Sequence, residues 1–225
     1  MKQVDGRWVE VNGIPILDSM TEVVQPRHTA LVVIDMQNAF CADDGSLAGA
    51  GLDISPLVEA VAPCRELLDS ARQAGVPVIF TRYVYRADYA DGGVVIRYLL
   101  PQLKDVNSLA AGTKDIEIID LLEPVDGEFV IDKNRPSAFY ATNIEPILNG
   151  LDVDSLVVCG VTTNICVEST VRDASQRDYK VFVVKDATGE LEQLRYDGAI
   201  AGMAWMFAKI VDKNEVLAVW GEGNK

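Results

Sequence analysis

Histidine is almost absent from this chain of 225 residues, in which His28 is the only one. A metal site built on several histidines is therefore excluded, and any Ser-His-Asp or Cys-His system would have to use His28. Because His28 stands just before an apolar run, in QPRHTALVV, we expect it to have a solvated or capping role. A general base must then be a carboxylate, a lysine or a tyrosine.

Cysteines are also few, and they show no CxxC spacing. The chain has Cys41, Cys64, Cys159 and Cys166. Free thiols in a cytoplasmic protein fit this pattern better than a disulfide framework or a zinc site. No apolar run reaches the ~20 residues that cross a bilayer, and the first 18 residues lack the hydrophobic core of a signal peptide. We therefore expect a cytoplasmic protein with no membrane partner.

Basic residues are outnumbered by acidic ones, 20 to 34, which gives a net charge of −14. No basic stripe is present to meet phosphates, so we expect no nucleic-acid partner. Nearly half of the residues are apolar, at 49%, and the length suits one large domain with a well-buried core. The sequence therefore predicts a globular protein whose acidity keeps it soluble.

Strand-like and helix-like stretches alternate along most of the chain. Residues 7–18, RWVEVNGIPILD, alternate around Asn-Gly and predict a hairpin outside the main sheet. Apolar runs predict six strands, at 30–35, 77–83, 127–133, 155–161, 180–186 and 209–211. Helical patterns predict helices at 54–74, 116–124, 143–151, 166–178, 190–208 and 214–220. Between them, 40–53 is predicted as a loop and 84–115 as a long irregular excursion.

This alternation predicts a single α/β domain over residues 1–225, with the hairpin as an extension over 1–27. Right-handed crossovers place helices on both faces of a parallel sheet, which makes three layers. Active sites of such sheets lie beyond the carboxyl ends of the strands. The first strand ends with Asp35, the third ends with Lys133, and the turn after the fourth leads to Cys166. We therefore expect an acid, an amine and a thiol at one edge.

Cys166 has two possible roles when GVTTNICVEST is considered alone. A helix N-terminus can stabilise a thiolate nucleophile, but free cysteines are often small core residues. The joint presence of Asp35 and Lys133 favours the nucleophile. The other three cysteines are expected to be packing or surface thiols. Trp205 and Met206, on an apolar helix face, are expected to pack in the core.

Three motifs, in order, resemble those of the isochorismatase-like cysteine hydrolases. They are ALVVIDMQNAF, IDKNRPSAFYATN and GVTTNICVESTVRDA. The resemblance covers roughly residues 28–220. It implies a Rossmann-like, six-stranded parallel sheet with helices on both faces, assembled as a homodimer or homotetramer.

The same resemblance implies roles for individual residues. Cys166 resembles the nucleophile, Asp35 the general base and Lys133 the third catalytic member. The positive charge of Lys133 favours the thiolate. The resemblance also implies a cis peptide bond between Val161 and Thr162, with the backbone N–H groups of Thr162 and Cys166 as the oxyanion hole.

Two departures from the family narrow the implied function. Metal-dependent nicotinamidases use an Asp and two histidines, but TRYVYRADYADGG contains no histidine. Isochorismatases proper lack the nucleophilic cysteine. We therefore expect a metal-independent cysteine amidohydrolase without a cofactor, which cleaves a C–N bond of a small linear amide or ureide through a thioester. The alternatives are an isochorismatase-type or other small-amide hydrolase, acting on maleamate or a nicotinamide-like amide, and a catalytically silent binding or scaffold member.

Candidate substrate-binding residues follow from position and side-chain chemistry. An arginine offers a planar fork of donors to a carboxylate or carbonyl, although each arginine here could equally form a salt bridge. The residues just after the predicted base and just before the nucleophile turn could also line the pocket. The candidates are Asn38, Phe40, Arg82, Arg86, Arg97, Arg135 and Val161. The many arginines and tyrosines of 82–98 favour a small polar substrate over an aromatic amide.

Overall fold

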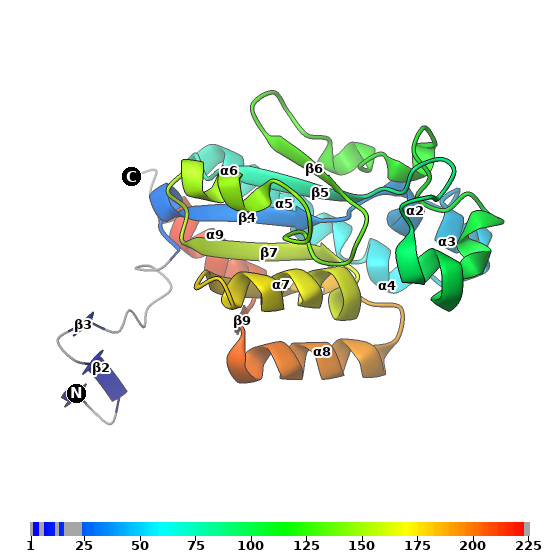
Figure 1. Ribbon diagram of the computed structural model, residues 1–225. Helices are drawn as coiled ribbons and strands as arrows, with labels where there is room; N and C mark the ends of the chain where they lie inside the picture. The colour runs from blue at the N-terminus through cyan, green and yellow to red at the C-terminus, as the bar shows by residue number, and fades with distance from the viewer. Residues whose placement is uncertain (1, 5–6, 12–13, 16–23, 223–225) are drawn as a thin grey trace.

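The central element of the protein is a six-stranded, all-parallel sheet in the order β6-β5-β4-β7-β8-β9 (Figure 1). The computed structural model describes residues 2–4, 7–11, 14–15 and 24–222. The strands are β4 (Thr29–Ile34), β5 (Val78–Tyr83), β6 (Phe129–Lys133), β7 (Ser155–Val161), β8 (Lys180–Gly189) and β9 (Lys209–Val211). Strands β4 and β7 are buried along their whole length, as expected for central strands covered on both faces. The predicted six-stranded parallel sheet is confirmed.

Helices cover both faces of this sheet, with α5 and α9 packed together on one face and α7 and α8 on the other (Figure 1). The α-helices are α2 (Asn38–Cys41), α3 (Ser46–Gly49), α4 (Ser55–Val58), α5 (Val61–Ala74), α6 (Ile144–Gly150), α7 (Glu168–Ser175), α8 (Gln193–Met206) and α9 (Lys213–Glu222). Shorter helical turns are η1 (Pro26–His28), η2 (Val95–Leu99), η3 (Pro101–Lys104), η4 (Lys114–Ile116), η5 (Asp120–Leu122) and η6 (Thr163–Val167). Within the described part of the chain, no helix is long and apolar enough to cross a membrane.

The N-terminal residues form a small antiparallel sheet of their own, in the order β1-β2-β3. Its strands are β1 (Lys2–Val4), β2 (Arg7–Val11) and β3 (Ile14–Pro15). Val11 pairs with Ile14, so the predicted hairpin, separate from the main sheet, is confirmed in its strands. Its Asn-Gly turn and residues 16–18 lie outside the described residues.

Three predicted elements differ from the structure. The helix over 54–74 is interrupted between α4 and α5, because Pro63 has no N–H to donate to the carbonyl of Glu59. The loop predicted over 40–53 contains α3 and the end of α2. The prediction of a helix over 116–124 is wrong. Ile118 forms an antiparallel bridge with Gln37, and only short 3-10 turns flank Ile118. Tertiary pairing with the segment after β4 overrides the local helical pattern there.

The expected burial of Trp205 and Met206 is also wrong. Their side chains are 88% and 76% exposed, and α8 buries only Ala199 and Met203. Because α8 is apolar around most of its circumference, its sequence does not indicate which side faces the core. The outer side of α8 is therefore an exposed apolar face.

Strands β4 and β7 approach each other closely at Gly160, which pairs with Ile34. Gly160 has a φ of +112°, and a Cβ at this position would lie 2.1 Å from the carbonyl oxygen of Ile34. Only glycine tolerates both the backbone conformation and the contact. Since Ile34 precedes Asp35 and Gly160 precedes the turn to Cys166, this contact sets the spacing of the two segments.

We expect Gly160→Ala to lower the free energy of unfolding by more than about 2 kcal/mol, because the added methyl group forces the two strands apart. Urea unfolding followed by circular dichroism measures this change. Gly198→Ala in α8 is the matched control, because its Cβ would meet no atom within 4 Å. That control should gain roughly 0.5–1 kcal/mol from better helix propensity. Equal stabilities for G160A and the parent would contradict the close-approach argument.

Candidate active site

Asp35, Lys133 and Cys166 lie together at the carboxyl edge of the sheet. Asp35 directly follows β4, Lys133 is the last residue of β6, and Cys166 lies in η6, the π-helical turn after β7. Strand β5 lies between β4 and β6 in the sheet, and β7 lies on the other side of β4. All three side chains are buried. The predicted meeting of an acid, an amine and a thiol at this edge is confirmed.

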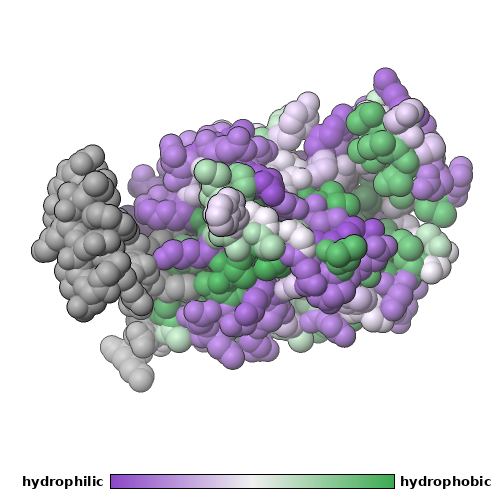
Figure 2. Space-filling model, turned by 90° about the horizontal axis from the view of Figure 1, so that it is seen from below, coloured by the Kyte–Doolittle hydropathy of each residue, from purple (hydrophilic) through white to green (hydrophobic). Residues whose placement is uncertain are grey.

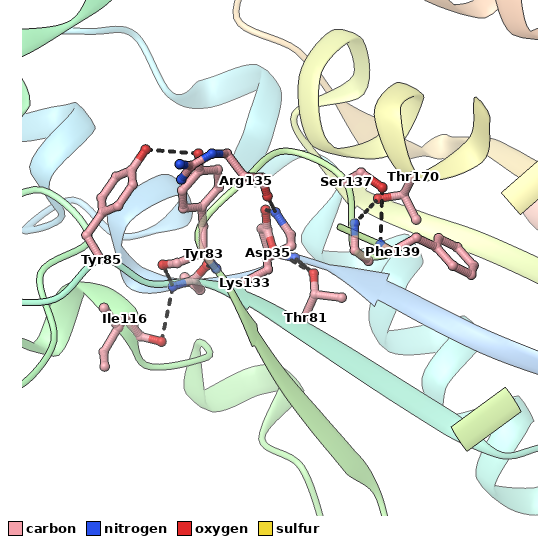
Figure 3. Close-up of polar contacts among 12 residues, drawn as sticks. Asp35, Thr81, Tyr83, Tyr85, Ile116, Lys133, Arg135, Ser137, Phe139 and Thr170 are labelled. Atoms are coloured by element: carbon pink, nitrogen blue, oxygen red, sulfur yellow. Dashed lines mark hydrogen bonds and ion pairs between the residues drawn. The ribbon is translucent and has the colours of Figure 1, made fainter. Parts of the chain in front are cut away.

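Asp35 and Lys133 form an ion pair that is fully out of contact with water. The Lys133 ammonium lies 2.7 Å from Oδ2 of Asp35, and both side chains are 0% exposed (Figure 3). The Thr81 hydroxyl donates to the other carboxylate oxygen, Oδ1, at 2.6 Å. Lys133 also donates to the Arg135 carbonyl at 3.2 Å, and its Nζ lies 4.4 Å from the ring centre of Tyr83. Each charge therefore has several partners, as a buried pair requires.

The protonation states of Lys133 and Cys166 follow from these contacts. Burial alone would lower the pKa of Lys133, but the negative charges of Asp35 and of a Cys166 thiolate raise it above its ordinary value. Burial, and then the charge of Asp35, raise the pKa of Cys166 well above that of a free thiol, although the Lys133 charge lowers it. Lys133 lowers the pKa of Cys166, as expected, but burial raises that pKa by more. Both directions favour an ammonium at Lys133 and a protonated thiol at Cys166.

The turn that carries Cys166 is fixed from two sides. The Val161–Thr162 peptide bond is cis, which confirms the prediction from the family resemblance. The Thr162 carbonyl accepts hydrogen bonds from the N–H groups of Ile165 and Val167, both at 3.2 Å. From the end of β8, the buried carboxylate of Glu190 accepts a bond from the Asn164 N–H at 3.3 Å. The sequence analysis missed Glu190, whose role depends on β8 lying beside β7.

Gln37 joins the segment after Asp35 to the end of β5. Its side-chain oxygen accepts from the Tyr83 N–H at 2.6 Å, and its side-chain nitrogen donates to the Tyr83 carbonyl at 3.1 Å. The same nitrogen donates to the Ile116 carbonyl at 3.2 Å (Figure 3). Because Gln37 is fully buried, these bonds hold the edge of the sheet around Asp35 in one arrangement.

A second set of hydrogen bonds joins the loop after Lys133 to α7, the helix that follows Cys166. The Thr170 hydroxyl accepts from the Ala138 N–H at 3.0 Å, and the Ser137 hydroxyl accepts from the Phe139 N–H at 3.1 Å (Figure 3). Ser137 also donates to the Asp173 carboxylate on α7. The segments that carry the amine and the thiol are thereby tied to each other.

The structure does not bring Arg82 to this group of side chains, and it brings Arg86 only to the lining of a cavity beside Lys133. Arg82 forms a two-point ion pair with Asp132, at 2.7 and 2.9 Å, and alternation along β5 turns it to the face opposite Thr81. Arg86 is exposed and pairs with Asp88. Arg97, on η2, is exposed as well. Arg82 and Arg86 thus have ion-pair partners in the fold, which residue type alone does not indicate.

The remaining candidates have mixed placements. Asn38 is buried and donates to the Lys114 carbonyl at 3.1 Å, and Phe40 belongs to the hydrophobic core. Val161 is buried at the end of β7, next to the cis bond. Arg135 is partly buried, donates to the Asp91 carbonyl at 2.9 Å, and lies near the tyrosines of the site (Figure 3). Arg135 therefore lies beside the tyrosines of the site, whereas Arg86 lines the cavity beside Lys133.

Tyr83 and Tyr85 complete the surroundings of Lys133 and were missed in the sequence analysis. The Tyr85 hydroxyl donates to the Tyr83 hydroxyl at 2.9 Å, and both side chains are buried. Burial, and then this hydrogen bond, raise the pKa of Tyr83, so it stays a neutral phenol. The sequence did contain a pattern that indicates this placement, because residues 81, 83 and 85 have the two-residue spacing of side chains on one face of a strand.

A cavity of about 280 Å³ opens beside Lys133. Its lining includes Tyr85, Arg86, Asp91, Lys133 and Asn134. Most of these side chains are polar, and the cavity is large enough for a small molecule. It touches Lys133 but not Cys166, so it adjoins the group of three rather than enclosing it.

Possible metal ligands do not gather anywhere in the described part of the chain. Among those residues, no group of three or more His, Cys, Asp or Glu side chains could hold a metal ion. His28 is exposed in η1, before β4, and so lies at the opposite end of that strand from Asp35. All four cysteines are free thiols. The expected solvated position of His28 is confirmed.

Comparison with known proteins gives a consistent family. The model of the isochorismatase domain matches residues 29–215. Ureidoacrylate amidohydrolase RutB of Agrobacterium fabrum is 36% identical over 180 residues, which cover 75% of this chain and 78% of that protein. Its counterpart in Serratia proteamaculans is 32% identical over 200 residues, which cover 83% and 80%.

Solved structures of the same fold include a cysteine hydrolase from Pseudomonas syringae pv. phaseolicola. It is 31% identical with a TM-score of 0.81, and the match covers 89% of this chain and 96% of that one. N-carbamoylsarcosine amidase from Thermoplasma acidophilum is 26% identical with a TM-score of 0.66, over 83% and 97% of the two chains. Because the isochorismatase domain matches most of its length, the chain belongs to the isochorismatase family of hydrolases.

Proposed function

We propose that this protein is a metal-independent cysteine amidohydrolase that cleaves a C–N bond of a small ureide or linear amide. The observation that carries the proposal is the buried Asp35 carboxylate, held by Lys133 and Thr81 at the edge of the sheet where Cys166 also lies. An acid of this kind can take a proton from the nucleophile and return it to a leaving nitrogen. Similarity to proteins named ureidoacrylate amidohydrolase and N-carbamoylsarcosine amidase supports the substrate class.

In the proposed reaction, Cys166 Sγ attacks the substrate carbonyl carbon while its proton passes to Asp35. The carbonyl oxygen becomes an oxyanion, which the backbone N–H groups of Thr162 and Cys166 stabilise by about 3–4 kcal/mol per donor. Asp35 then gives its proton to the leaving nitrogen, which departs as ammonia or an amine and leaves a thioester. Water attacks the thioester with Asp35 again as base, and the acid product and the thiol are released.

The surroundings of Lys133 favour a small polar substrate. The hydroxyl of Tyr83, which accepts from Tyr85, and the guanidinium of Arg135 offer donors, and the adjoining cavity is small and polar. A substrate that leaves buried polar groups unpaired is strongly disfavoured. Ureides present a carbonyl and several N–H groups, whereas aromatic amides present a large apolar ring. This contrast supports a ureide over a nicotinamide-like amide.

We expect kcat/KM for ureides to exceed that for aromatic amides by about 100-fold or more, because a polar pocket rejects an apolar ring. The measurement is ammonia release, directly or through carbamate, from biuret, ureidoacrylate-like acids and N-carbamoyl amino acids. Nicotinamide and benzamide are the aromatic comparison. Preference for the aromatic amides would refute the polar-pocket argument. Hydrolysis of no compound in either group would favour a binding or scaffold role.

The nucleophile is tested in the same assay with two matched cysteine variants. Cys166→Ser should fold normally and lose nearly all turnover, because a serine hydroxyl is far harder to deprotonate than a thiol. Cys41→Ser is the control, because burial raises the pKa of that thiol to about 12 and it takes no part in the proposed reaction. Turnover of C166S within tenfold of the parent would remove Cys166 from the mechanism.

We also propose that turnover needs no metal or cofactor, since Asp35, Lys133 and Cys166 supply the base, the positive charge and the nucleophile. Dialysis against a strong chelator should therefore leave kcat unchanged within error. The assay uses the best substrate of the screen, before and after dialysis. Activity that falls on dialysis and returns with added zinc or manganese would contradict this proposal.

We place the protein in the cytosol, because its four cysteines are free thiols and a reducing compartment keeps such thiols reduced. We further propose that it works as a homo-oligomer through the outer side of α8. Leu194, Trp205 and Met206 are 83%, 88% and 76% exposed there. Figure 2 views the molecule from the side on which α8 lies and shows pale and green residues between purple ones. The sequence between 198 and 206 carries no charge, so two acidic copies can meet there without repulsion.

Leu194 and Trp205 lie at the two ends of this face, with small residues between them. A second copy related by a two-fold axis would pack each tryptophan near the leucine of the other, which makes the face self-complementary. Trp205→Glu should therefore shift the mass toward the monomer in size-exclusion chromatography with light scattering. Leu121→Glu, at another position that is 62% exposed, is the control and should leave the mass unchanged. A monomeric parent would refute the proposal.

A further inference from the structure

We propose that Thr81 is a positioning residue for Asp35, which holds the carboxylate so that it can receive the Cys166 proton. The inference rests on the proposed function and adds a residue to its machinery. Thr81 is the only side chain that bonds Oδ1 of Asp35 among the contacts of the described residues, and it does so at 2.6 Å. The Lys133 ammonium contacts Oδ2 at 2.7 Å, so the two carboxylate oxygens have different partners.

Strand pairing places Thr81 for this contact. Thr81 lies in β5, is fully buried and pairs with Ile34, the residue before Asp35. The chain turns at Asp35, whose φ is +49°, and this turn brings its side chain back toward β5. The Asp35 N–H donates to the Thr81 carbonyl at 3.1 Å, and this backbone bond survives any substitution at position 81. A variant at this position therefore removes only the contacts of the Thr81 side chain, which are the bond to Oδ1 and a second bond from the Asp35 N–H to Oγ1.

The direction of the Thr81 hydroxyl is also defined. The Asp35 N–H lies 3.2 Å from Thr81 Oγ1 and donates to it as well, so this oxygen already acts as an acceptor. A threonine hydroxyl has one hydrogen, and that hydrogen is left for the Asp35 carboxylate. A hydrogen bond from a hydroxyl to a carboxylate oxygen restricts the rotation of the carboxylate. Thr81 thus holds Asp35 as an oriented acceptor.

Other charged or titratable groups also face Asp35 from each element packed around it. They are Lys133 from β6, Tyr83 from β5 and Cys166 from η6. Lys133 supplies charge at Oδ2, and Tyr83 is neutral. Neither of them bonds Oδ1. Cys166 itself shares a hydrogen bond with the Asp35 carboxylate, and this is the contact along which the proton would pass. Without the Thr81 hydroxyl, Oδ1 would lose its neutral donor, and the carboxylate could rotate out of line with the thiol.

The test uses iodoacetamide as the probe, because alkylation of Cys166 needs no knowledge of the substrate. Sγ displaces iodide from the probe and forms an S–C bond, while the thiol proton passes to Asp35 and then to water. Mass spectrometry of the peptide that contains Cys166 separates this rate from that of the other cysteines. The variants are Thr81→Ser, Thr81→Ala and Thr81→Val, with thermal unfolding measured for each.

The three variants separate positioning from packing. Serine and alanine both lack the methyl group and differ in the hydroxyl, whereas valine keeps the volume and lacks the hydroxyl. We expect T81A and T81V to lower the alkylation rate about tenfold, the effect of one hydrogen bond to a charged group, and T81S to stay within about threefold. With a hydrolysed substrate, kcat should fall in the same order while KM stays within about twofold. A purely structural role instead makes T81V the best variant.

Alkylation of T81A or T81V at the parent rate overturns the inference, as does T81S reacting as slowly as T81A. If T81V fails to fold, the serine and alanine pair still decides the question. The inference and the proposed function fail separately. If T81A is alkylated slowly and the parent hydrolyses no ureide, the positioning role of Thr81 is supported and the proposed amidase function is refuted. If the parent hydrolyses ureides and T81A is alkylated at the parent rate, the amidase function is supported and the positioning role is refuted.

Discussion

The buried ion pair between Asp35 and Lys133 is the contact on which the rest of the site depends. Removing each charge from water costs several kcal/mol unless the partner is held in good geometry with further hydrogen bonds. The two residues extend from β4 and β6, so β5 between them must end level with both. Thr81 and Tyr83 lie on that middle strand and contact the two charges. The register of three parallel strands is therefore a requirement of the chemistry as well as of the fold.

Burial also explains how the thiol can be both stable at rest and reactive with a substrate. Desolvation raises the pKa of Cys166, so the resting protein does not hold a thiolate that would react with any electrophile. In the proposed reaction, the carboxylate beside it takes the proton only when a new bond to Sγ begins to form, and then carries that proton to the leaving nitrogen. One buried acid would thus serve both halves of the proposed amide cleavage.

The sequence predicted those parts of the site that depend on strand ends, and missed those that depend on neighbours in the sheet. Asp35, Lys133 and Cys166 follow strands, and alternation of strands and helices brings such ends to one edge. Thr81 lies inside an apolar strand, and its role arises from pairing with Ile34, which no local pattern records. Arg82 was predicted to bind the substrate because of its residue type, but as the neighbour of Thr81 in β5 it points to the opposite face of the sheet. The exposed side of α8 was missed because an evenly apolar helix has no preferred face.

The catalytic group and the substrate surroundings have different structural supports, and this division bears on specificity. The acid, the amine and their hydrogen-bond partner extend from paired strands, and the thiol turn is held by its own backbone and by Glu190. The cavity beside Lys133 is lined mostly by the irregular segment after β5 and by the loop after β6. Such loops tolerate changes in sequence far better than a buried charge pair does. Under the proposed mechanism, changes in these loops can therefore alter the substrate while the proton transfer between Cys166 and Asp35 stays the same.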